Sequence, residues 1–340
     1  MVNEMKTKIM ILAALAATIV LTSCEKVSPA GILMAGTAVE DRVKMSNQYF
    51  LNYKNDFKFN ITEYEYTFLV GSDSHLTTDP GRMDEMLAIG LRDEDLLYAH
   101  LGDIADTKVE YYITLDSLLD EAKGRYVDKY YDKNSKGFYY PRFDKEEAEI
   151  YQLTFNDIKF PFYPVVGNHD ITHNGWALWS NIFHSSFYEF PIVVAMDDDK
   201  LVVDRFIFLD TASGTLGRTQ IDLIEDGVVD GSDDFKYRHT FVFGHTNIFR
   251  PQLMEFASTF AREETFFLLN QFDKWDASIV FCGHVHKWDE RVYNNVVYLT
   301  LESMSERNSP NPGDYLIRVH VKRDGTLTWE HVHMDYVAKK

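Results

Sequence analysis

Aspartate, asparagine and histidine recur at points where a short apolar run ends and the backbone is expected to turn. Five such motifs follow one another along the chain: Asp73-Ser74-His75, Gly102-Asp103-Ile104-Ala105-Asp106, Gly167-Asn168-His169-Asp170, Gly244-His245 and Gly283-His284-Val285-His286. Carboxylate oxygens and imidazole nitrogens together are ligands for divalent transition metals. Two such ions about 3.5–4 Å apart neutralise a phosphate and lower the pKa of a bound water. The motifs therefore predict a two-metal site in which Asp103 is shared by both ions.

Each motif needs a strand in front of it, and the sequence supplies one. Apolar runs with the length of buried strands precede the motifs, at 66–70, 96–99, 162–166, 240–243 and 278–282. Open α/β sheets place their ligand sites beyond the carboxyl ends of such strands. We therefore expect the motifs to converge in the fold. A sixth run, 205–209, ends in Asp210 without a glycine.

In this order, the five motifs resemble those of the calcineurin-like metallophosphoesterases. All five are complete and extend over residues 66–286, about two thirds of the chain. The resemblance implies an α/β fold, a two-sheet α/β/β/α sandwich. It also implies di-metal-dependent hydrolysis of a phosphodiester or phosphomonoester by a metal-activated hydroxide.

The resemblance further assigns seven ligands to two divalent ions. The first ion would take Asp73, His75, Asp103 and His286, and the second would take Asp103, Asn168, His245 and His284. Manganese, iron and zinc all suit this mixture of imidazole and carboxylate, so the identity of the metal stays open.

Two further residues have implied catalytic roles. His169 would be the general acid that protonates the leaving group. Asp106 would orient it and keep it protonated, because a neighbouring carboxylate raises the pKa of a histidine. The alternative for Asp106 is a helix N-cap. Asp170 is interpreted as structural. Purple acid phosphatases carry a tyrosine ligand where this chain has Asp106, so a tyrosinate–iron site is disfavoured.

Two motifs have ligand-type residues two positions apart, and this spacing predicts the backbone conformation at each. Residues two apart in an extended chain point the same way, so Asp73 and His75 are expected to reach one ion from an extended segment. His284 and His286 have the same spacing, but the resemblance gives one to each ion. We therefore expect a turn at His284 and His286.

The beginning of the chain has the pattern of a bacterial lipoprotein signal. Lys6 and Lys8 precede a twelve-residue, almost wholly apolar run at 9–20, and Leu21-Thr22-Ser23-Cys24 follows it. Such a run is too short to span a bilayer comfortably. We predict that residues 1–23 are removed and that Cys24 is acylated, so that the protein is anchored in the cell envelope and faces the periplasm or the exterior. A plain signal peptide with a chance cysteine and a retained anchor are the alternatives.

The net charge of the chain argues against one class of binding partner, the nucleic acids. The 340 residues carry a formal charge of −19, which repels a polyphosphate backbone and argues against general nucleic-acid binding. A small phosphoester remains a suitable substrate, because the charge of the metals dominates such a site. The remaining cysteine, Cys282, is interpreted as a small core residue, with a metal ligand beside His284 as the alternative.

We interpret residues 24–40 as a tether and residues 41–340 as one domain with an insertion at about 107–160. Helices are expected at 39–53, 83–91 and 111–125. Three alternating runs at 296–301, 315–321 and 327–333 are expected to finish a second sheet as antiparallel strands. The insertion either shapes the substrate pocket or is a surface elaboration packed away from it.

Two other functions are compatible with the motifs. The protein could be a membrane-anchored binding protein that keeps the phosphoesterase scaffold with little catalysis. The site could also hold a single or non-catalytic metal. Loss of a ligand is the usual mark of the binding scaffold, and no ligand is lost here.

Overall fold

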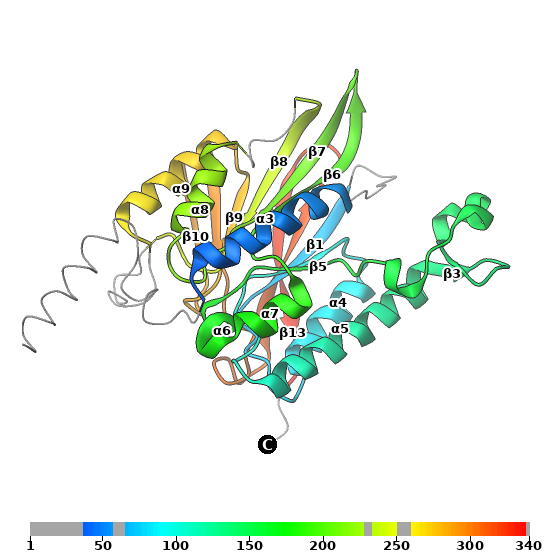
Figure 1. Cartoon of the computed structure of the whole chain (residues 1–340), viewed down its shortest axis with the longest axis horizontal. Coiled ribbons are helices and arrows are strands. Elements are labelled where there is room, and N and C mark those ends of the chain that lie inside the picture. Colours follow the sequence, from blue (N-terminus) through cyan, green and yellow to red (C-terminus); the bar gives the residue numbers. More distant parts are fainter. Residues whose placement is uncertain (1–36, 57–64, 228–232, 250–259, 338–340) are drawn as a thin grey trace, which may run out of the picture.

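Two mixed β-sheets lie face to face, and helices cover the outer face of each sheet (Figure 1). The computed structural model describes residues 37–56, 65–227, 233–249 and 260–337. The predicted α/β/β/α sandwich is therefore confirmed. The predicted signal sequence and Cys24 lie outside the described residues. Among the described helices, none has the length and apolar character needed to cross a bilayer.

The first sheet has five strands in the order β13-β12-β1-β2-β5. Their bounds are Tyr66–Gly71 (β1), Tyr98–His100 (β2), Phe162–Pro164 (β5), Gly313–Val321 (β12) and Leu327–Met334 (β13). Strands β1, β2 and β5 are parallel, whereas β12 and β13 each run antiparallel to their inner neighbour. Because parallel strands end at one edge, the loops that carry Asp73, Asp103 and Asn168 start side by side.

The second sheet has six strands in the order β10-β11-β9-β8-β7-β6. Their bounds are Tyr188–Asp197 (β6), Lys200–Phe208 (β7), Phe235–Phe243 (β8), Ile279–Cys282 (β9), Asp289–Tyr293 (β10) and Val296–Thr300 (β11). Strands β7, β8, β9 and β11 are parallel. Strands β8 and β9 lead directly into His245 and His284, so this sheet supplies the histidine side of the predicted site.

A layer of aromatic side chains fills the space between the sheets. Phe206 and Phe208 of β7 belong to this core together with Phe68 of β1, whereas Ile207 between them packs under the helices. The alternation follows from the strand itself, since successive side chains point to opposite faces. The rings of Phe68 and Phe206 meet edge to face at 5.4 Å. Burying such a side chain contributes about 1.5–3 kcal/mol.

Helices from both halves of the chain cover the sandwich (Figure 1). Those over the first sheet are α4 (Gly81–Arg92), α5 (Val109–Tyr130) and α7 (Trp176–Phe183). Those over the second sheet are α3 (Val39–Asp56), α8 (Gly217–Glu225) and α9 (Arg262–Lys274). The three predicted helices correspond to α3, α4 and α5, each of which is longer than expected. A short helix, α6 (Asn168–Ile171), directly follows β5.

The three predicted strands at the end of the chain are present, and β12 and β13 are antiparallel, but the expectation that all three finish one sheet is wrong. Strand β11 joins the second sheet, where it runs parallel to β9, but β12 and β13 extend the first sheet beyond β1. The chain therefore crosses from one sheet to the other after β11. An alternating pattern shows that one face of a strand is buried, but it does not show which sheet buries it.

The insertion at 107–160 is a long helix followed by an arm. Helix α5 begins beside the predicted site, where Thr107 Oγ1 donates a hydrogen bond of 2.6 Å to His169 O. Its 22 residues extend over about 33 Å. The hairpin of β3 (Tyr131–Lys133) and β4 (Tyr139–Pro141) follows at the far end and projects from the sandwich, together with the 3₁₀ segment Arg142–Ile150 (Figure 1). The arm is thus a surface elaboration away from the site, and the pocket alternative does not hold for it.

Asp210, at the end of the sixth apolar run, has a structural role. Asp210 follows β7 and forms a bidentate pair with Arg42 of α3, with Nε–Oδ2 at 2.9 Å and Nη2–Oδ1 at 2.8 Å. Both side chains are fully buried. Ser213 Oγ accepts a further bond from Arg42 at 3.1 Å. The pair therefore fixes α3 to the carboxyl edge of the second sheet.

We predict that Asp210→Ala destabilises the protein by about 3–5 kcal/mol, because it leaves the buried guanidinium of Arg42 without its counter-charge. Urea unfolding monitored by circular dichroism measures the loss. The matched control is the double variant Arg42→Met/Asp210→Leu, which replaces both charges by apolar groups and should recover most of the stability. A single variant as stable as the wild type would contradict the structural role.

Candidate metal centre

Six carboxylate and imidazole side chains form two groups that share Asp103. The first group is Asp73, His75, Asp103 and His286, and the second is Asp103, His245 and His284. Within each group the candidate ligand atoms lie within 4.8 Å of one another. The loops after β1, β2, β8 and β9 carry these residues, so the site is built at the seam between the two sheets.

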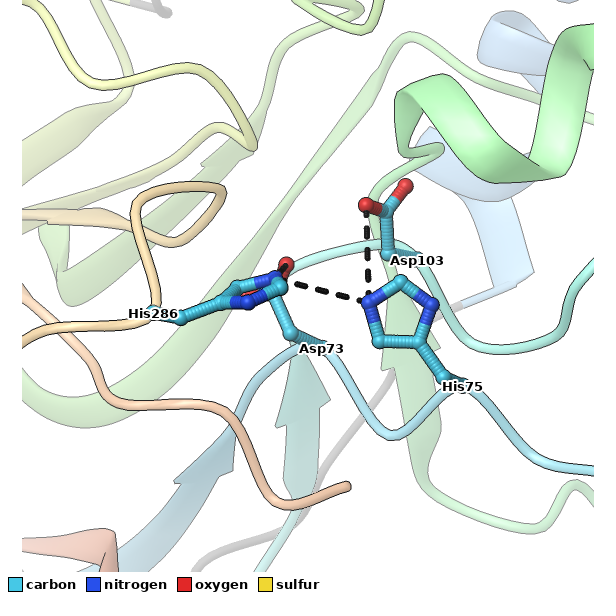
Figure 2. A group of neighbouring side chains, drawn as sticks. All are labelled: Asp73, His75, Asp103 and His286. Atoms are coloured by element: carbon cyan, nitrogen blue, oxygen red, sulfur yellow. Dashed lines mark hydrogen bonds and ion pairs between the residues drawn. The ribbon is translucent and has the colours of Figure 1, made fainter. Parts of the chain in front are cut away.

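The first group closes around a small central space (Figure 2). His286 Nε2 lies 3.1 Å from Asp73 Oδ1 and 3.4 Å from His75 Nε2. His75 Nε2 lies 4.0 Å from Asp103 Oδ2. Figure 2 shows the two imidazole rings directed at each other, with a carboxylate at each. These are the four residues that the resemblance assigned to the first ion.

The second group centres on His245 Nε2. This atom lies 3.2 Å from His284 Nδ1, 3.5 Å from Asp103 Oδ2 and 2.9 Å from Asn168 Oδ1. The amide oxygen of Asn168 thus joins the two histidines and the shared carboxylate. The structure therefore brings together all seven predicted ligands, in the two sets that the resemblance implied.

Asp103 divides its two oxygens between the groups and the backbone. Oδ2 is the atom that approaches the histidines of both groups. Oδ1 accepts the N–H of His169 at 2.7 Å, which holds the carboxylate in one orientation. The neighbouring chain must come very close, since a Cβ at Gly167 would lie 2.0 Å from Asp103 N. Glycine at 167 is therefore a steric requirement of the shared ligand.

Hydrogen bonds to the other ring nitrogens orient two of the imidazoles. His245 Nδ1 donates to Leu101 O at 2.7 Å, and His75 Nδ1 donates to Asp106 Oδ1 at 3.1 Å. Because Nδ1 carries the proton in each ring, Nε2 has a free lone pair that faces the other ligands, as in metal-binding histidines. A cation placed among these nitrogens and the carboxylate oxygens would satisfy their lone pairs. The donor set therefore fits divalent ions such as manganese, iron or zinc.

The backbone at the ligands is left-handed, which corrects one expectation. Asp73 and His75 have φ of 51° and 44°, so the extended segment predicted for them is absent. The reason is that this loop follows the loop after β2, with Asp73 N bonded to Gly102 O and His75 N bonded to Asp103 O. The expected turn at His284 and His286 is present, with φ of 70° and 53°.

Neighbouring charges and burial shift the pKa values of two candidate ligands toward the protonation states that bind a metal. Burial raises the pKa of Asp73, but the hydrogen bond from His286 and the charge of His245 outweigh it and hold the pKa below its usual value. Burial lowers the pKa of His284 to about 4, assisted by the charge of His245. A carboxylate and a neutral imidazole are the forms that bind a metal.

His169 and Asp106 lie at the open side of the first group. His169 Nδ1 is 3.0 Å from Asp106 Oδ1, and its side chain is 40% exposed. The hydrogen bond to Asp106 raises the pKa of His169 to about 9, against the opposing effect of burial. In turn, the bonds from His169 and His75 lower the pKa of Asp106. The pair has the geometry of an imidazolium and its orienting carboxylate, and Asp106 is not the N-cap of α5, which is Lys108.

Asp170 lies behind the site and binds only scaffold groups among the described residues. Its carboxylate accepts the N–H groups of Gly167 at 2.8 Å, Ile104 at 3.1 Å and Ala105 at 3.2 Å. These bonds tie the loop after β5 to the loop after β2. The contacts agree with the structural interpretation of this residue. Cys282 is likewise buried in the core, and burial raises its pKa to about 12.

The loop after β11 is the part of the site that sequence reasoning missed. Ser303 Oγ donates to Asp73 O at 2.8 Å, and Arg307 Nη1 lies 3.4 Å from Asp106 Oδ2. The signal was present, because the polar run Glu302-Ser303-Met304-Ser305-Glu306-Arg307 follows an apolar strand in the same way as the five motifs do. It contains no histidine or aspartate, so it did not stand out as a ligand motif.

Comparison with known proteins gives similarity in shape only. No family model matches the sequence, and no curated protein matches it. Among solved structures, the chain is similar to GAP50, the anchor in the inner membrane complex of Plasmodium, with 11% identity and a TM-score of 0.44 over 81% of this chain and 90% of that one. It is similar to a dimetal phosphatase from Danio rerio, with 11% identity and a TM-score of 0.44 over 75% and 92%. A third similar structure is TT1561 of Thermus thermophilus, with 9% identity and a TM-score of 0.42 over 78% and 99%. The functional argument accordingly rests on the arrangement of side chains described above.

We predict that Asp103→Ala abolishes binding of both ions, because both groups use its Oδ2. His286→Ala and His284→Ala are the matched controls, since each removes a ligand from one group only and should leave about one ion bound. Elemental analysis of protein purified with manganese measures the metal content per chain. Full metal content in Asp103→Ala would contradict the shared position of this carboxylate.

Proposed function

We propose that this protein is a calcineurin-like metallophosphoesterase that hydrolyses a small phosphoester with two divalent metal ions. The observation that carries the proposal is the pair of ligand groups sharing Asp103, with the imidazole of His169 beside them. Asp73, His75, Asp103 and His286 would hold one ion, and Asp103, Asn168, His245 and His284 would hold the other. When bound, two such ions neutralise the phosphate, lower the pKa of water and align the attacking and leaving oxygens.

The protein's own contribution begins with orientation. The bonds from His245 Nδ1 to Leu101 O and from His75 Nδ1 to Asp106 keep two ring lone pairs directed inward. The bond from His169 N to Asp103 Oδ1 keeps the shared carboxylate from rotating. Asn168 would add a neutral ligand, whose side chain would not add negative charge beside the phosphate. The substrate thus meets a positioned set of groups, which lowers the entropic part of the barrier.

His169 would supply the proton that the leaving group needs. With Nδ1–H bound to Asp106, the imidazolium has its Nε2–H free to donate to the departing oxygen. The exposed fraction of 40% lets the ring reach a substrate. The raised pKa of His169 keeps it protonated near neutral pH. Proton transfer by a positioned acid contributes about 10²–10⁴ in rate.

We predict that His169→Asn keeps its metals and loses about 10²–10⁴ in rate on alkyl phosphoesters, yet loses far less on nitrophenyl esters. An alkyl alkoxide is strongly basic and needs the proton, whereas nitrophenolate leaves readily without it. Asp106→Asn should show the same pattern more weakly, because it acts through His169. Steady-state kinetics on matched alkyl and nitrophenyl esters measure the difference.

The wild type is first screened with manganese against monoesters, diesters, cyclic nucleotides and pyrophosphates, with and without chelator. His333→Asn, an exposed histidine on β13, is the control for loss of a surface imidazole. Equal losses on both ester types in His169→Asn would assign the ring to positioning instead of acid catalysis. A metal-loaded wild type that cleaves no member of the panel would favour the binding scaffold over the enzyme.

We also propose that the enzyme is a lipoprotein of the cell envelope, anchored through Cys24. The support is the basic start, the short apolar run and the sequence Leu-Thr-Ser-Cys that ends at this residue. An anchor of this kind would hold the site outside the cytoplasm, where it would meet small phosphoesters.

We predict that cells expressing the full chain incorporate labelled palmitate into the wild type and not into Cys24→Ser, which should also leave the membrane fraction or remain unprocessed. Cys282→Ser removes the other cysteine and serves as the matched control that keeps the label. Wild-type protein found free in solution with residues 1–23 still attached would refute the anchor.

A further inference from the structure

A pocket of about 210 Å³ opens beside the first ligand group, between the start of α4 and the loop after β11. His75 and Asp106 form its wall toward the metal centre. Thr77, Asp79, Glu306 and Arg307 also line the pocket. Sites for drug-sized ligands measure about 300–1,000 Å³, so this pocket fits a small group.

The loop that carries Arg307 is fixed to the metal centre. Ser303 Oγ and Ser305 N both donate to Asp73 O, at 2.8 and 3.2 Å. Met304 N donates to Ser72 O at 2.9 Å. The backbone just before Arg307 is therefore held against the loop that supplies a metal ligand, which places the start of the Arg307 side chain beside the site.

The other polar groups of the pocket satisfy one another. The N–H groups at the start of α4 are taken, Gly81 N by Asp79 Oδ1 and Arg82 N by Glu306 Oε1, both at 3.1 Å. Arg82 itself is buried and donates its guanidinium to three backbone carbonyls. The N–H groups of the helix start are thus occupied, and Arg82 is buried with each of its guanidinium nitrogens already bonded to a carbonyl.

Arg307, unlike Arg82, has an exposed guanidinium with few hydrogen-bond partners. Its side chain is 62% exposed, and among the described residues its guanidinium has one side-chain partner, Asp106 Oδ2 at 3.4 Å. A guanidinium carries five N–H donors in a planar fork that matches a carboxylate or a phosphate. Most of these donors are free to meet a ligand in the pocket.

Asp106 connects this pocket to the chemistry. One of its oxygens accepts from His169, which would protonate the leaving group, and the other faces Arg307. A leaving oxygen beside His169 would therefore project its substituent along Asp106 into the pocket. We propose that the pocket binds the leaving group, an inference that rests on the proposed function. Arg307 then selects substrates whose leaving group carries a second anion, a carboxylate or a phosphate.

The test compares three esters with similar small alcohols: ethyl phosphate, 2-phosphoglycolate and ethylene glycol bisphosphate, together with their methyl phosphodiester forms. Arg307→Gln should lower kcat/KM about 10–100-fold on the esters with an anionic leaving group, the effect of losing a charge-assisted hydrogen bond. It should change the ethyl ester by less than about threefold, within the net effect of one neutral hydrogen bond. If Arg307→Gln lowers kcat/KM on only one of the two charged esters, the anion of that ester, carboxylate or phosphate, is the one that Arg307 selects. Equal losses on all three esters would overturn the proposal.

Arg92→Gln is the matched control, since Arg92 is an exposed arginine at the far end of α4 that pairs with Asp93. It should leave all rates unchanged. A wild type that cleaves neither these esters nor any member of the wider panel would refute the proposed function, and a binding experiment then still decides the role of Arg307.

That experiment uses two non-hydrolysable phosphonates of equal length, 3-phosphonopropionate and propylphosphonate, with the manganese-loaded protein in a calorimeter. The wild type should bind the carboxylate-bearing compound about tenfold more tightly or better, and Arg307→Gln should bind both alike. Absence of this preference in the wild type, or its persistence in Arg307→Gln, would overturn the inference.

Discussion

The shared carboxylate of Asp103 is the constraint on which the rest of the site depends. One oxygen faces histidines from loops of both sheets, and the other is held by a backbone N–H of the His169 loop. Such a position is possible only where three loops meet without side chains in the way. That is why glycine stands at 167, where any Cβ would collide with Asp103. The face-to-face packing of the sheets brings these loops together.

The scaffold meets this requirement with two kinds of contact. The aromatic layer around Phe68 and Phe206 fixes the distance and angle between the sheets, so that the loops after β1 and β2 face those after β8 and β9. Buried polar groups then fix the loops themselves: Asp170 ties the β5 loop to the β2 loop, and Arg42 ties α3 to Asp210. The left-handed backbone of five ligand residues carries a conformational cost. Rigid surroundings are what keep them in place.

Electrostatics divides the site into two parts with different roles. Inside, burial and opposite charges favour a carboxylate at Asp73 and a neutral ring at His284, which are the forms that bind metal. At the rim, Asp106 favours a charged ring at His169. The same carboxylate faces Arg307, so it lies between the acid and the pocket. In our proposals, this one residue connects proton transfer with the choice of leaving group.

Much of this could be predicted from the sequence because the motifs are local. A strand followed by glycine and a ligand-type residue is readable in a few letters, and the resemblance that these motifs carry implied the fold class, the seven ligands and the pairing of His169 with Asp106. What depends on distant parts of the chain could not be read. The sequence did not show that β12 and β13 return to the first sheet, that Asp210 faces Arg42 or that the arm after α5 lies far from the site. Nor did it show the left-handed backbone at Asp73 and His75, because the neighbouring loop imposes it through hydrogen bonds. Arg307 reaches Asp106 across 201 positions of sequence, and only the packing of the loop after β11 against Asp73 places it there.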